Sequence, residues 1–295
     1  MSIIVLGSNG QLGKSIKDQF DHHKIKAIFL SRDEVNFEKT EEIQKIQKFH
    51  PKIVINCAAY TNVDGAEKDK ETCKKVNVSA LLKLSEACKL GGINLIHISS
   101  DYVFDGNSKI PYNEDSNTSP NSFYGKSKLQ GEKIIIGSQC SATIIRTSWV
   151  YSEYGNNFLK TMLMFGAKKN KIQVVSDQIG CPTYTQDLAH LILNITQDIK
   201  NGVHKNDIYH YCGDEALSWF DFAIRIFKDA ANLGFVIPNI IEPVSSSEYK
   251  TLAKRPAYSV LDCSKAESVL KAKKSSVSNG IRTALKRLSE NDQKL

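Results

Sequence analysis

Long hydrophobic runs are missing from this 295-residue sequence, since no apolar stretch approaches the ~18 residues that a membrane-spanning helix needs. The chain also opens without a basic leader or a small-residue cleavage site, so no secretory signal is indicated. Its 17 glycines and 7 prolines, with 41% hydrophobic and 24% charged residues, exclude collagen-like, low-complexity and disordered chains. We therefore expect a folded cytoplasmic protein that makes no membrane contact.

Metal-binding and disulfide patterns are also missing. The seven cysteines are an odd number, none of them belongs to a CxxC pair, and several lie in apolar strand-like runs. This usage predicts buried, reduced thiols. The seven histidines form no HxxxH or HExxH motif, so the sequence gives no support for zinc chemistry.

A strong excess of one charge is missing as well, because 39 basic and 32 acidic residues give a net charge of only +7. Part of this excess lies between residue 261 and the C-terminus, where Ile281, Leu285 and Leu288 have the spacing of an amphipathic helix. No aromatic-interleaved basic patch or DNA-binding motif accompanies it, so we expect no nucleic-acid partner. A basic surface would equally suit a small anionic substrate.

Short β-branched runs alternate with helical patterns in the first half of the chain. The strand candidates are Ile3–Gly7, Lys26–Leu30, Ile53–Ala58, Asn94–Ser99 and Ala142–Thr147. Because these runs do not alternate apolar with polar residues, both faces of their sheet must be covered by helices, one of them within 67–90. The pattern predicts an α/β fold with a doubly wound parallel sheet, whose ligands bind beyond the carboxyl ends of the strands.

The rhythm changes after about residue 150. Helix candidates there are Phe158–Ala167, Gln186–Gln197 and Ser218–Leu233, separated by longer polar loops. We divide the chain into residues 1–150, which hold the sheet, and residues 151–295, a smaller region that forms the other wall of a cleft. The boundary is soft, because a later strand near 173–176 is a candidate to join the sheet.

A glycine-rich turn follows the first strand. Gly7, Gly10 and Gly13 form GxxGxxG, a relative of the dinucleotide fingerprint. The glycines permit a tight turn, close approach of the backbone to a pyrophosphate, and close packing of helix on strand. An ordinary strand–helix turn shows glycines too, but the position after an N-terminal strand and before a helix favours a Rossmann dinucleotide site.

The second strand ends without the acidic residue that usually binds the adenosine ribose. Ser31 and Arg32 stand there instead, and a guanidinium can pair with a 2′-phosphate through two hydrogen bonds. The sequence therefore favours NADPH, with NADH as the alternative. Asp33 follows directly, and Arg32 as a solvated loop residue is the competing interpretation.

The fourth strand and the helix after it carry the catalytic pattern. Ser100 lies at the strand end, and Tyr124 and Lys128 are four residues apart, which places them on one helix face. A tyrosine is a weak acid at neutral pH, and a nearby ammonium group lowers its pKa. The Ser100 hydroxyl can donate to a substrate carbonyl whose oxygen gains charge during hydride transfer. Tyr124 and Lys128 alone would also fit a half-buried helix face, but the combination predicts a reductase.

These motifs resemble the extended short-chain dehydrogenase/reductase superfamily and, more closely, the dTDP-4-dehydrorhamnose reductase family. The shared segments are Gly7–Gly13, Cys57–Asp64, Ser99–Gly106, Tyr124–Lys128, Arg146–Tyr151, Gly155–Phe158, Asp177–Thr183 and the pair Arg255 and Pro256. They extend over nearly the whole chain. Those in the second region are more specific than the features that Rossmann proteins share.

The resemblance implies an NAD(P)H-dependent oxidoreductase that reduces the C4 ketone of dTDP-6-deoxy-L-lyxo-4-hexulose to dTDP-β-L-rhamnose, for surface polysaccharide of the lipopolysaccharide O-antigen type. Tyr124 would then be the proton donor, and Lys128 would tune its pKa and hold the nicotinamide ribose. Ser100 stands where the family usually has threonine, which keeps the hydroxyl and loses a methyl group. A dTDP-sugar is the expected partner, and a homodimer is compatible with the resemblance.

The resemblance also assigns binding roles. The cofactor-binding residues would be Gly7, Asn9, Gly10, Gln11, Leu12, Gly13, Ser31, Arg32, Cys57, Ala58, Ala59, Tyr60, Ser99, Tyr124 and Lys128. The substrate-binding residues would be Ser100, Asp101, Tyr102, Trp149, Asn157, Gln178 and Arg255. Trp149 would pack against the hexose and Arg255 would suit the diphosphate. Without the resemblance, Trp149 is ordinary packing, Asp101 caps a turn and Arg255 is a solvated charge.

Magnesium is the departure from the family pattern. Some relatives use it with acidic residues at a subunit contact, one of them in the first helix, where this chain has Lys14 and Ser15. Because a hard dication prefers carboxylate oxygens, its ligands are not evident here and we expect no metal site.

Two alternatives stay open. One is a reductase of another nucleoside-diphosphate 4-keto-6-deoxyhexose. The other is a non-catalytic, NADP-binding regulatory subunit, although such proteins commonly lose an active-site group, and Ser100, Tyr124 and Lys128 are all present.

Overall fold

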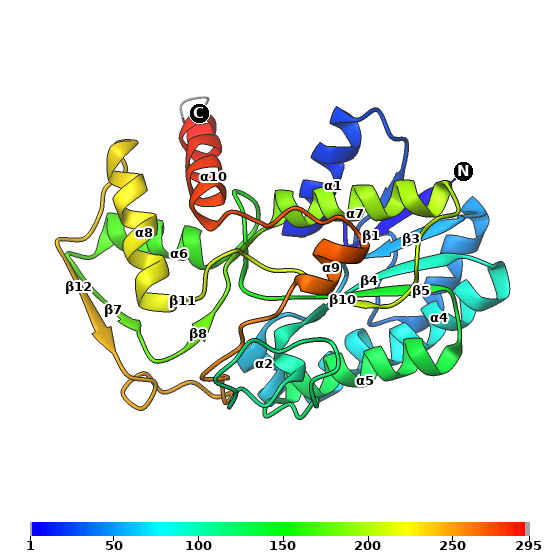
Figure 1. The fold of residues 1–295 in the computed structure, drawn as a ribbon, viewed down its shortest axis with the longest axis horizontal. Helices are drawn as coiled ribbons and strands as arrows, with labels where there is room; N and C mark the ends of the chain where they lie inside the picture. Colours follow the sequence, from blue (N-terminus) through cyan, green and yellow to red (C-terminus); the bar gives the residue numbers. More distant parts are fainter. Residues whose placement is uncertain (1, 293–295) are drawn as a thin grey trace.

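A six-stranded parallel sheet lies within residues 2–292, the part of the chain that the computed structural model describes (Figure 1). Its strands follow the order β10-β5-β4-β3-β1-β2. Their bounds are β1 Ile3–Leu6, β2 Ile28–Leu30, β3 Ile53–Asn56, β4 Asn94–Ser100, β5 Ala142–Thr147 and β10 Ile208–His210. All five predicted strands are present, and the predicted α/β class with a parallel sheet is confirmed.

Helices cover both faces of the sheet, and each face has its own hydrophobic core (Figure 1). The covering helices are α1 Gln11–His22 and α7 Thr185–Lys200 on one face, and α4 Ala80–Gly91 and α5 Phe123–Ser138 on the other. Successive residues of β1 alternate between the two cores: Ile3 and Val5 pack with α1 and α7, whereas Ile4 and Leu6 pack with α4. Because both faces are buried, the strands show no apolar–polar alternation.

The helical stretch predicted over 67–90 is divided into several pieces. They are α2 Val63–Lys68, α3 Lys70–Lys74, the π-helical turn η2 Lys75–Ser79 and α4 Ala80–Gly91. Asp69 starts α3 by accepting a hydrogen bond from the Thr72 N–H at 3.0 Å. The wide turn of η2 carries Asn77, whose side chain bonds both the N–H and the carbonyl of Tyr60. The interruption thus fixes the loop after β3, which borders the predicted cofactor site.

Residues after β5 build a second region with its own core. Its helices are α6 Phe158–Lys168, α8 Trp219–Asn232 and α10 Val277–Asp292, with a short helix α9 Ser264–Val269. Its short strands pair as β6 Val150–Tyr151 with β9 Thr183–Tyr184, β8 Ile179–Gly180 with β11 Leu217–Ser218, and β7 Lys171–Val175 with β12 Ile240–Val244. Buried side chains of α6, α8 and α10 pack together around Tyr151 and Tyr184.

One topological expectation is wrong. The segment near 173–176 does not join the main sheet, because β7 pairs with β12 in a separate two-stranded sheet. The strand that extends the main sheet is β10, which pairs with β5 from Ile208 opposite Ile144 to His210 opposite Arg146. Residues well beyond 150, including α7, therefore pack on the first region.

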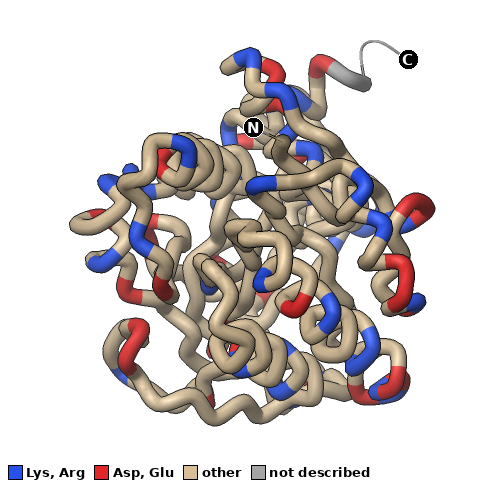
Figure 2. The backbone as a smooth tube through the Cα atoms, turned by 90° about the vertical axis from the view of Figure 1, so that its right-hand side faces the viewer, with Lys and Arg blue, Asp and Glu red and all other residues tan. Residues whose placement is uncertain are grey.

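Acidic and basic residues are interspersed over the face shown in Figure 2, so the net positive charge does not gather on one side in this view. Among the described residues, no helix combines the length and the hydropathy needed to span a bilayer.

A polar cluster joins the first helix to the C-terminal helix. Arg287 of α10 pairs with Asp18 of α1 at 3.4 Å and with Glu153 of the loop after β6. The Tyr184 hydroxyl donates to Glu153 at 3.1 Å, and the Gln186 amide donates to Asp18 at 2.6 Å. The side chain of Glu153 is only 2% exposed, so it depends on this cation.

Replacing Arg287 with methionine is expected to lower the free energy of unfolding by about 2 kcal/mol, because Glu153 would remain buried without its cation. This value lies between those of surface and fully buried ion pairs. Urea denaturation of Arg287→Met and of Arg282→Met, an exposed arginine on the same helix, provides the comparison. Equal stability of the two variants would contradict the role of Arg287.

Candidate active site

Tyr124 and Lys128 lie one turn apart on α5, and both side chains are buried. Ser122 caps this helix by accepting the Gly125 N–H at 3.1 Å. A side chain at Gly125 would collide with the Tyr102 carbonyl, so the glycine lets α5 approach the end of β4 closely. As a result the rings of Tyr124 and Tyr102 meet edge to face, 5.5 Å apart.

Ser100 is the last residue of β4 and lies beside Tyr124. Its hydroxyl donates to Asp101 Oδ1 at 2.9 Å and accepts the Tyr102 N–H at 3.2 Å. Burial raises the pKa of Asp101 to about 6, although hydrogen bonds from Ser259 and Ser100 oppose the shift. The structure therefore brings Ser100, Tyr124 and Tyr102 together, as the sequence predicts.

The electrostatics of Tyr124 differ from the expectation. Burial raises the pKa of the phenol above its ordinary value of 10, and the neighbouring Ser100 hydroxyl opposes this shift only in part. The net pKa of Tyr124 is therefore raised rather than lowered, and the stabilisation of its phenolate by Lys128 stays a prediction. Lys128 instead donates to the Ile98 carbonyl at 2.7 Å, and burial lowers its own pKa to about 8. A phenol with a high pKa keeps its proton at neutral pH, as a proton donor must.

The glycine-rich turn has the geometry of a phosphate-binding loop. Gly7 has φ +75°, and a Cβ there would lie 2.7 Å from the Ala58 nitrogen. A Cβ on Gly13 would lie 2.5 Å from the Gly7 carbonyl oxygen, so only glycine lets α1 pack so closely on the turn. The first residues of α1 direct their free N–H groups toward this turn.

A cleft of about 220 Å³ opens at this turn and gathers most of the predicted cofactor residues. The cofactor-binding residues predicted from the sequence that line this cleft are Gly7, Asn9, Gly10, Arg32, Cys57, Ala58, Ala59 and Tyr60. Others take supporting positions: Gln11 accepts hydrogen bonds from Ser152 and Asn157, and Ser99 donates to Glu132. Leu12 packs into the core under α1, and the Ser31 N–H donates to Glu34 at 2.7 Å.

Arg32 reaches the cleft, but it already pairs with an acidic residue there, Glu38. Glu38 lies eight residues beyond the end of β2, and it reaches the cleft only because the chain turns back through residues 31–38, so the strand-end pattern does not predict it. Asn36 and Phe37 line the cleft through the same turn. An acidic residue several positions after the end of the second strand is the sequence signal for such a contact.

A second cavity, of about 320 Å³, brings Gln178 and Arg255 together. Arg255 pairs with Asp64 at 2.9 Å, which links the substrate half to the Cys57–Asp64 motif of the cofactor half. Arg255 also lies against Tyr102 and lowers the pKa of that phenol, which burial raises to about 12. Tyr102 in turn contacts Tyr124, so it connects Arg255 of this cavity to that phenol.

Aromatic residues of this cavity are absent from the sequence prediction. Trp219 and Tyr249 line it together with Phe158. Trp149 lies directly behind Trp219, with the two indole rings stacked 3.4 Å apart and 3° from parallel. Trp149 has φ +46° and packs on Gly180, so it supports the wall that Trp219 forms. This position differs from the hexose contact that we expect for Trp149.

Asn157 also differs from its expected role. Its Oδ1 caps α6 by accepting the Lys160 N–H at 3.1 Å, and its Nδ2 donates to Gln11, Ser152 and Tyr154. The amide therefore holds this loop against the glycine-rich turn, and its contact with the substrate stays a prediction.

A buried ion pair lies one helical turn after Lys128. Glu132, one turn after Lys128, binds the Arg146 guanidinium at 2.7 and 3.0 Å, and Ser99 donates to the same carboxylate. The Glu132 charge supports the protonated form of Lys128. The spacing of Lys128 and Glu132 predicts that they share a helix face. The contact with Arg146 depends on how β5 packs against this helix, which the sequence does not show.

Comparison with known proteins identifies the family of this chain. Residues 1–290 match the family described as the RmlD substrate binding domain. The chain belongs to this family. A member from Aggregatibacter actinomycetemcomitans, named dTDP-4-dehydrorhamnose reductase, is 38% identical over 90% of this chain and 92% of its own length.

Solved structures of this family have the same fold. A dTDP-4-dehydrorhamnose reductase from Clostridium acetobutylicum has a TM-score of 0.89 and 34% identity, covering 98% of this chain and 99% of that chain. A second, from Bacillus anthracis in complex with NADP, has a TM-score of 0.88 and 33% identity, covering 97% and 99%. The predicted superfamily and the reductase resemblance are confirmed.

A metal site is not supported by the residues of this family member. Across residues 2–290, whose side chains the structure describes, no group of three His, Cys, Asp or Glu side chains is arranged to hold a metal ion. Near α1, where Lys14 and Ser15 stand, the carboxylates of Asp18 and Glu153 are bound by the Arg287 guanidinium instead. These two carboxylates are thus already paired with a positive charge of the protein itself.

Proposed function

We propose that this protein is a dTDP-4-dehydrorhamnose reductase that uses a nicotinamide dinucleotide to reduce the C4 ketone of dTDP-6-deoxy-L-lyxo-4-hexulose to dTDP-β-L-rhamnose, a precursor of surface polysaccharide. One observation carries the proposal: Tyr124 and Tyr102 pack with Tyr60 of the glycine-rich cleft, and Tyr102 also lies against Arg255 of the second cavity, with the Ser100 hydroxyl beside Tyr124. A cofactor in the first and a sugar nucleotide in the second would meet at these hydroxyl groups.

The roles of the residues follow from their positions. The nicotinamide dinucleotide supplies the hydride when it is bound, with its pyrophosphate against the Gly7–Gly13 turn. Ser100 donates a hydrogen bond to the C4 carbonyl oxygen, and Tyr124 gives its proton to the alkoxide that forms there. Lys128, lying one turn away, would hold the nicotinamide ribose, and its ammonium group stabilises the phenolate that remains on Tyr124.

Substrate binding is assigned to the second cavity. Arg255 binds the diphosphate, to which its planar guanidinium can donate two hydrogen bonds. Trp219 and Tyr249 offer flat apolar surfaces to the thymine and sugar, and Gln178 supplies an amide at the same wall. Asp101 and Tyr102 complete the floor between this cavity and Tyr124. We further propose that residues 1–150 mainly bind the cofactor and residues 151–295 mainly bind the sugar nucleotide.

The experiment that tests the proposal follows NADPH oxidation at 340 nm with the 4-keto sugar produced from dTDP-glucose by the preceding dehydratase and epimerase. Product analysis must show dTDP-rhamnose. No turnover would refute the reductase function and favour a non-catalytic binding protein. Equal turnover of a 4-keto-6-deoxyhexose on another nucleoside diphosphate would refute the assigned specificity.

NADPH is the cofactor that we propose this enzyme prefers, because Arg32 lies at the cleft where a 2′-phosphate would bind. Glu38 competes for Arg32, so the preference is moderate. Replacing Arg32 with alanine should raise KM for NADPH about tenfold, the effect of losing ~1.4 kcal/mol, and leave KM for NADH unchanged. Glu38→Gln is the matched variant and should lower KM for NADPH. A similar change in both KM values in Arg32→Ala would contradict the assignment.

A further inference from the structure

Three thiols converge beside the end of β10, away from Tyr124. The sulfur atoms of Cys212 and Cys263 lie 3.6 Å apart, and Cys263 Sγ accepts the backbone N–H of Cys212 at 3.3 Å. Cys181 packs in the same cluster as Cys212 and, together with Cys263 and burial, raises the pKa of the Cys212 thiol. All three are free thiols, so the sequence prediction of reduced cysteines agrees with the structure. Their clustering could not be read from positions so far apart in the chain.

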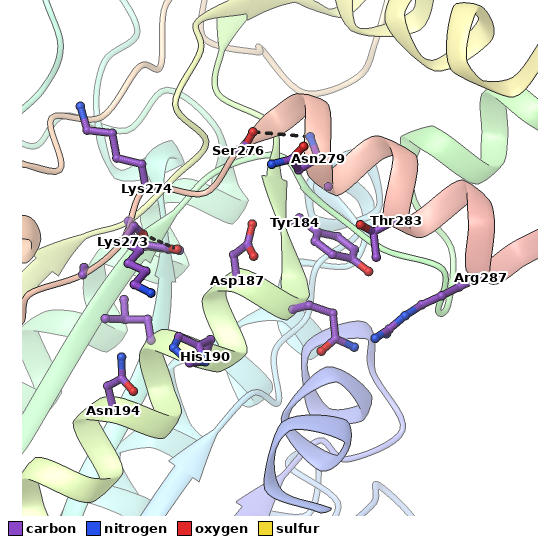
Figure 3. Close-up of a pocket in the computed structure, with 15 residues that line it drawn as sticks. Tyr184, Asp187, His190, Asn194, Lys273, Lys274, Ser276, Asn279, Thr283 and Arg287 are labelled. Atoms are coloured by element: carbon purple, nitrogen blue, oxygen red, sulfur yellow. Dashed lines mark hydrogen bonds between the residues drawn. The ribbon is translucent and has the colours of Figure 1, made fainter. Parts of the chain in front are cut away.

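Solvent can reach this group of thiols. A cavity of about 410 Å³ is lined by all three sulfur-bearing residues, together with Lys273 and Lys274. Cys212 and Cys181 are buried at its base, whereas Cys263 is only half-buried. Lys273 and Lys274 also line a neighbouring cavity between α7 and α10, where Figure 3 shows Lys273 extending toward His190 and Lys274 pointing away from it. A small polar reagent therefore meets Cys263 first.

We propose that Cys212 and Cys263 form a reversible disulfide when the enzyme encounters a peroxide. The Cys263 thiolate attacks one peroxide oxygen, the O–O bond breaks, and the hydroxide released takes up a proton as water. Cys263 is then a sulfenic acid. The Cys212 sulfur attacks it, the S–O bond breaks, and a second water leaves with the Cys212 proton. Two thiols are oxidised and one peroxide is reduced to two waters.

The disulfide would join the end of the main sheet to the segment that carries Arg255. Cys212 follows β10, whose neighbour Tyr211 bonds the Arg146 carbonyl at 2.9 Å. Cys263 ends the segment 249–263, which carries Arg255 and crosses β8 where the Ser259 N–H bonds Ile179 at 2.8 Å. The bond would close a loop between positions 51 residues apart. Such a cross-link restricts the unfolded chain and stabilises the fold.

The test uses the full-length reduced enzyme and hydrogen peroxide in small excess. Intact mass should fall by two hydrogen atoms, and peptide mapping should show a cross-link between Cys212 and Cys263 that dithiothreitol reverses. The oxidised enzyme should melt about 5 °C or more above the reduced enzyme, the shift expected from a typical disulfide in a chain of this size.

Matched variants decide whether the pair is responsible. Cys263→Ser and Cys212→Ser should lose the cross-link and the melting shift, whereas Cys140→Ser, a half-buried cysteine before β5, should keep both. Circular dichroism and NADPH turnover show that each variant is folded. The proposal is overturned if wild type forms no cross-link, if the cross-link joins Cys181 instead, or if zinc titration shows one ion protecting all three thiols from alkylation.

Discussion

Replacing Tyr124 with phenylalanine is expected to lower kcat about 10²–10⁴-fold, because removal of a general acid typically costs that much. The phenol is the proton donor in the proposed reaction, and burial keeps it protonated at neutral pH. Its ring should stay in place through the edge-to-face contact with Tyr102. KM and the affinity for NADPH should therefore change little, so the loss falls on kcat.

The matched control is Tyr209→Phe. Tyr209 is another buried tyrosine, and its hydroxyl donates only to the Lys205 carbonyl, at 2.9 Å, away from both cavities of the active site. Steady-state kinetics with the 4-keto sugar and fluorescence titration with NADPH separate turnover from binding. Near-wild-type kcat in Tyr124→Phe, or an equal loss in Tyr209→Phe, would refute Tyr124 as the proton donor.

The largest expected effect on stability belongs to Arg146→Met. Arg146 and Glu132 are 4% and 1% exposed, so removal of the arginine leaves a buried carboxylate without its cation. Breaking a buried pair in this way costs about 3–5 kcal/mol in free energy of unfolding. The loss should also include the contact of the guanidinium with the Phe104 ring, whose centre lies 5.2 Å away.

Two further variants test this explanation by urea denaturation. Arg146→Met combined with Glu132→Leu should recover most of the lost stability, because no charge then remains buried. Arg225→Met removes an arginine that pairs with Glu215 at 2.7 Å on the surface, and it should cost under about 1 kcal/mol. If the double variant is no more stable than the single one, the uncompensated Glu132 charge is not the cause.

Local sequence patterns predict much of the fold. The runs at 3–6 and 142–147 became strands because continuous β-branched sequence in an α/β rhythm has few other solutions. Tyr124 and Lys128 share a helix face through their spacing alone. The position of β10 depended instead on long-range pairing, since its three residues, Ile208–His210, become a strand only beside β5.

The substrate side was harder to predict for the same reason. Trp219 forms the cavity wall because Trp149 stacks behind it, and the two residues are 70 positions apart in the chain. Glu38 reaches Arg32 only after the chain turns back on itself. The direction of the pKa shift at Tyr124 depends on how deeply the helix is buried, and the sequence contains no measure of that depth.

The two cores that share β1 have a consequence for the register of the sheet. In a sheet with one solvent-exposed face, a shift of one strand by one residue would expose its apolar side chains to water. The free-energy cost of this exposure fixes the register of the strand. Here Ile3 and Val5 would simply exchange cores with Ile4 and Leu6, so hydrophobicity alone discriminates weakly between alignments. The alignment must be fixed at the strand end, where the Gly7 N–H bonds Leu30 at 3.0 Å and its Cα faces Ala58. Gly7, which belongs to the proposed phosphate-binding turn, thus also fixes the alignment of β1 with β2 and β3.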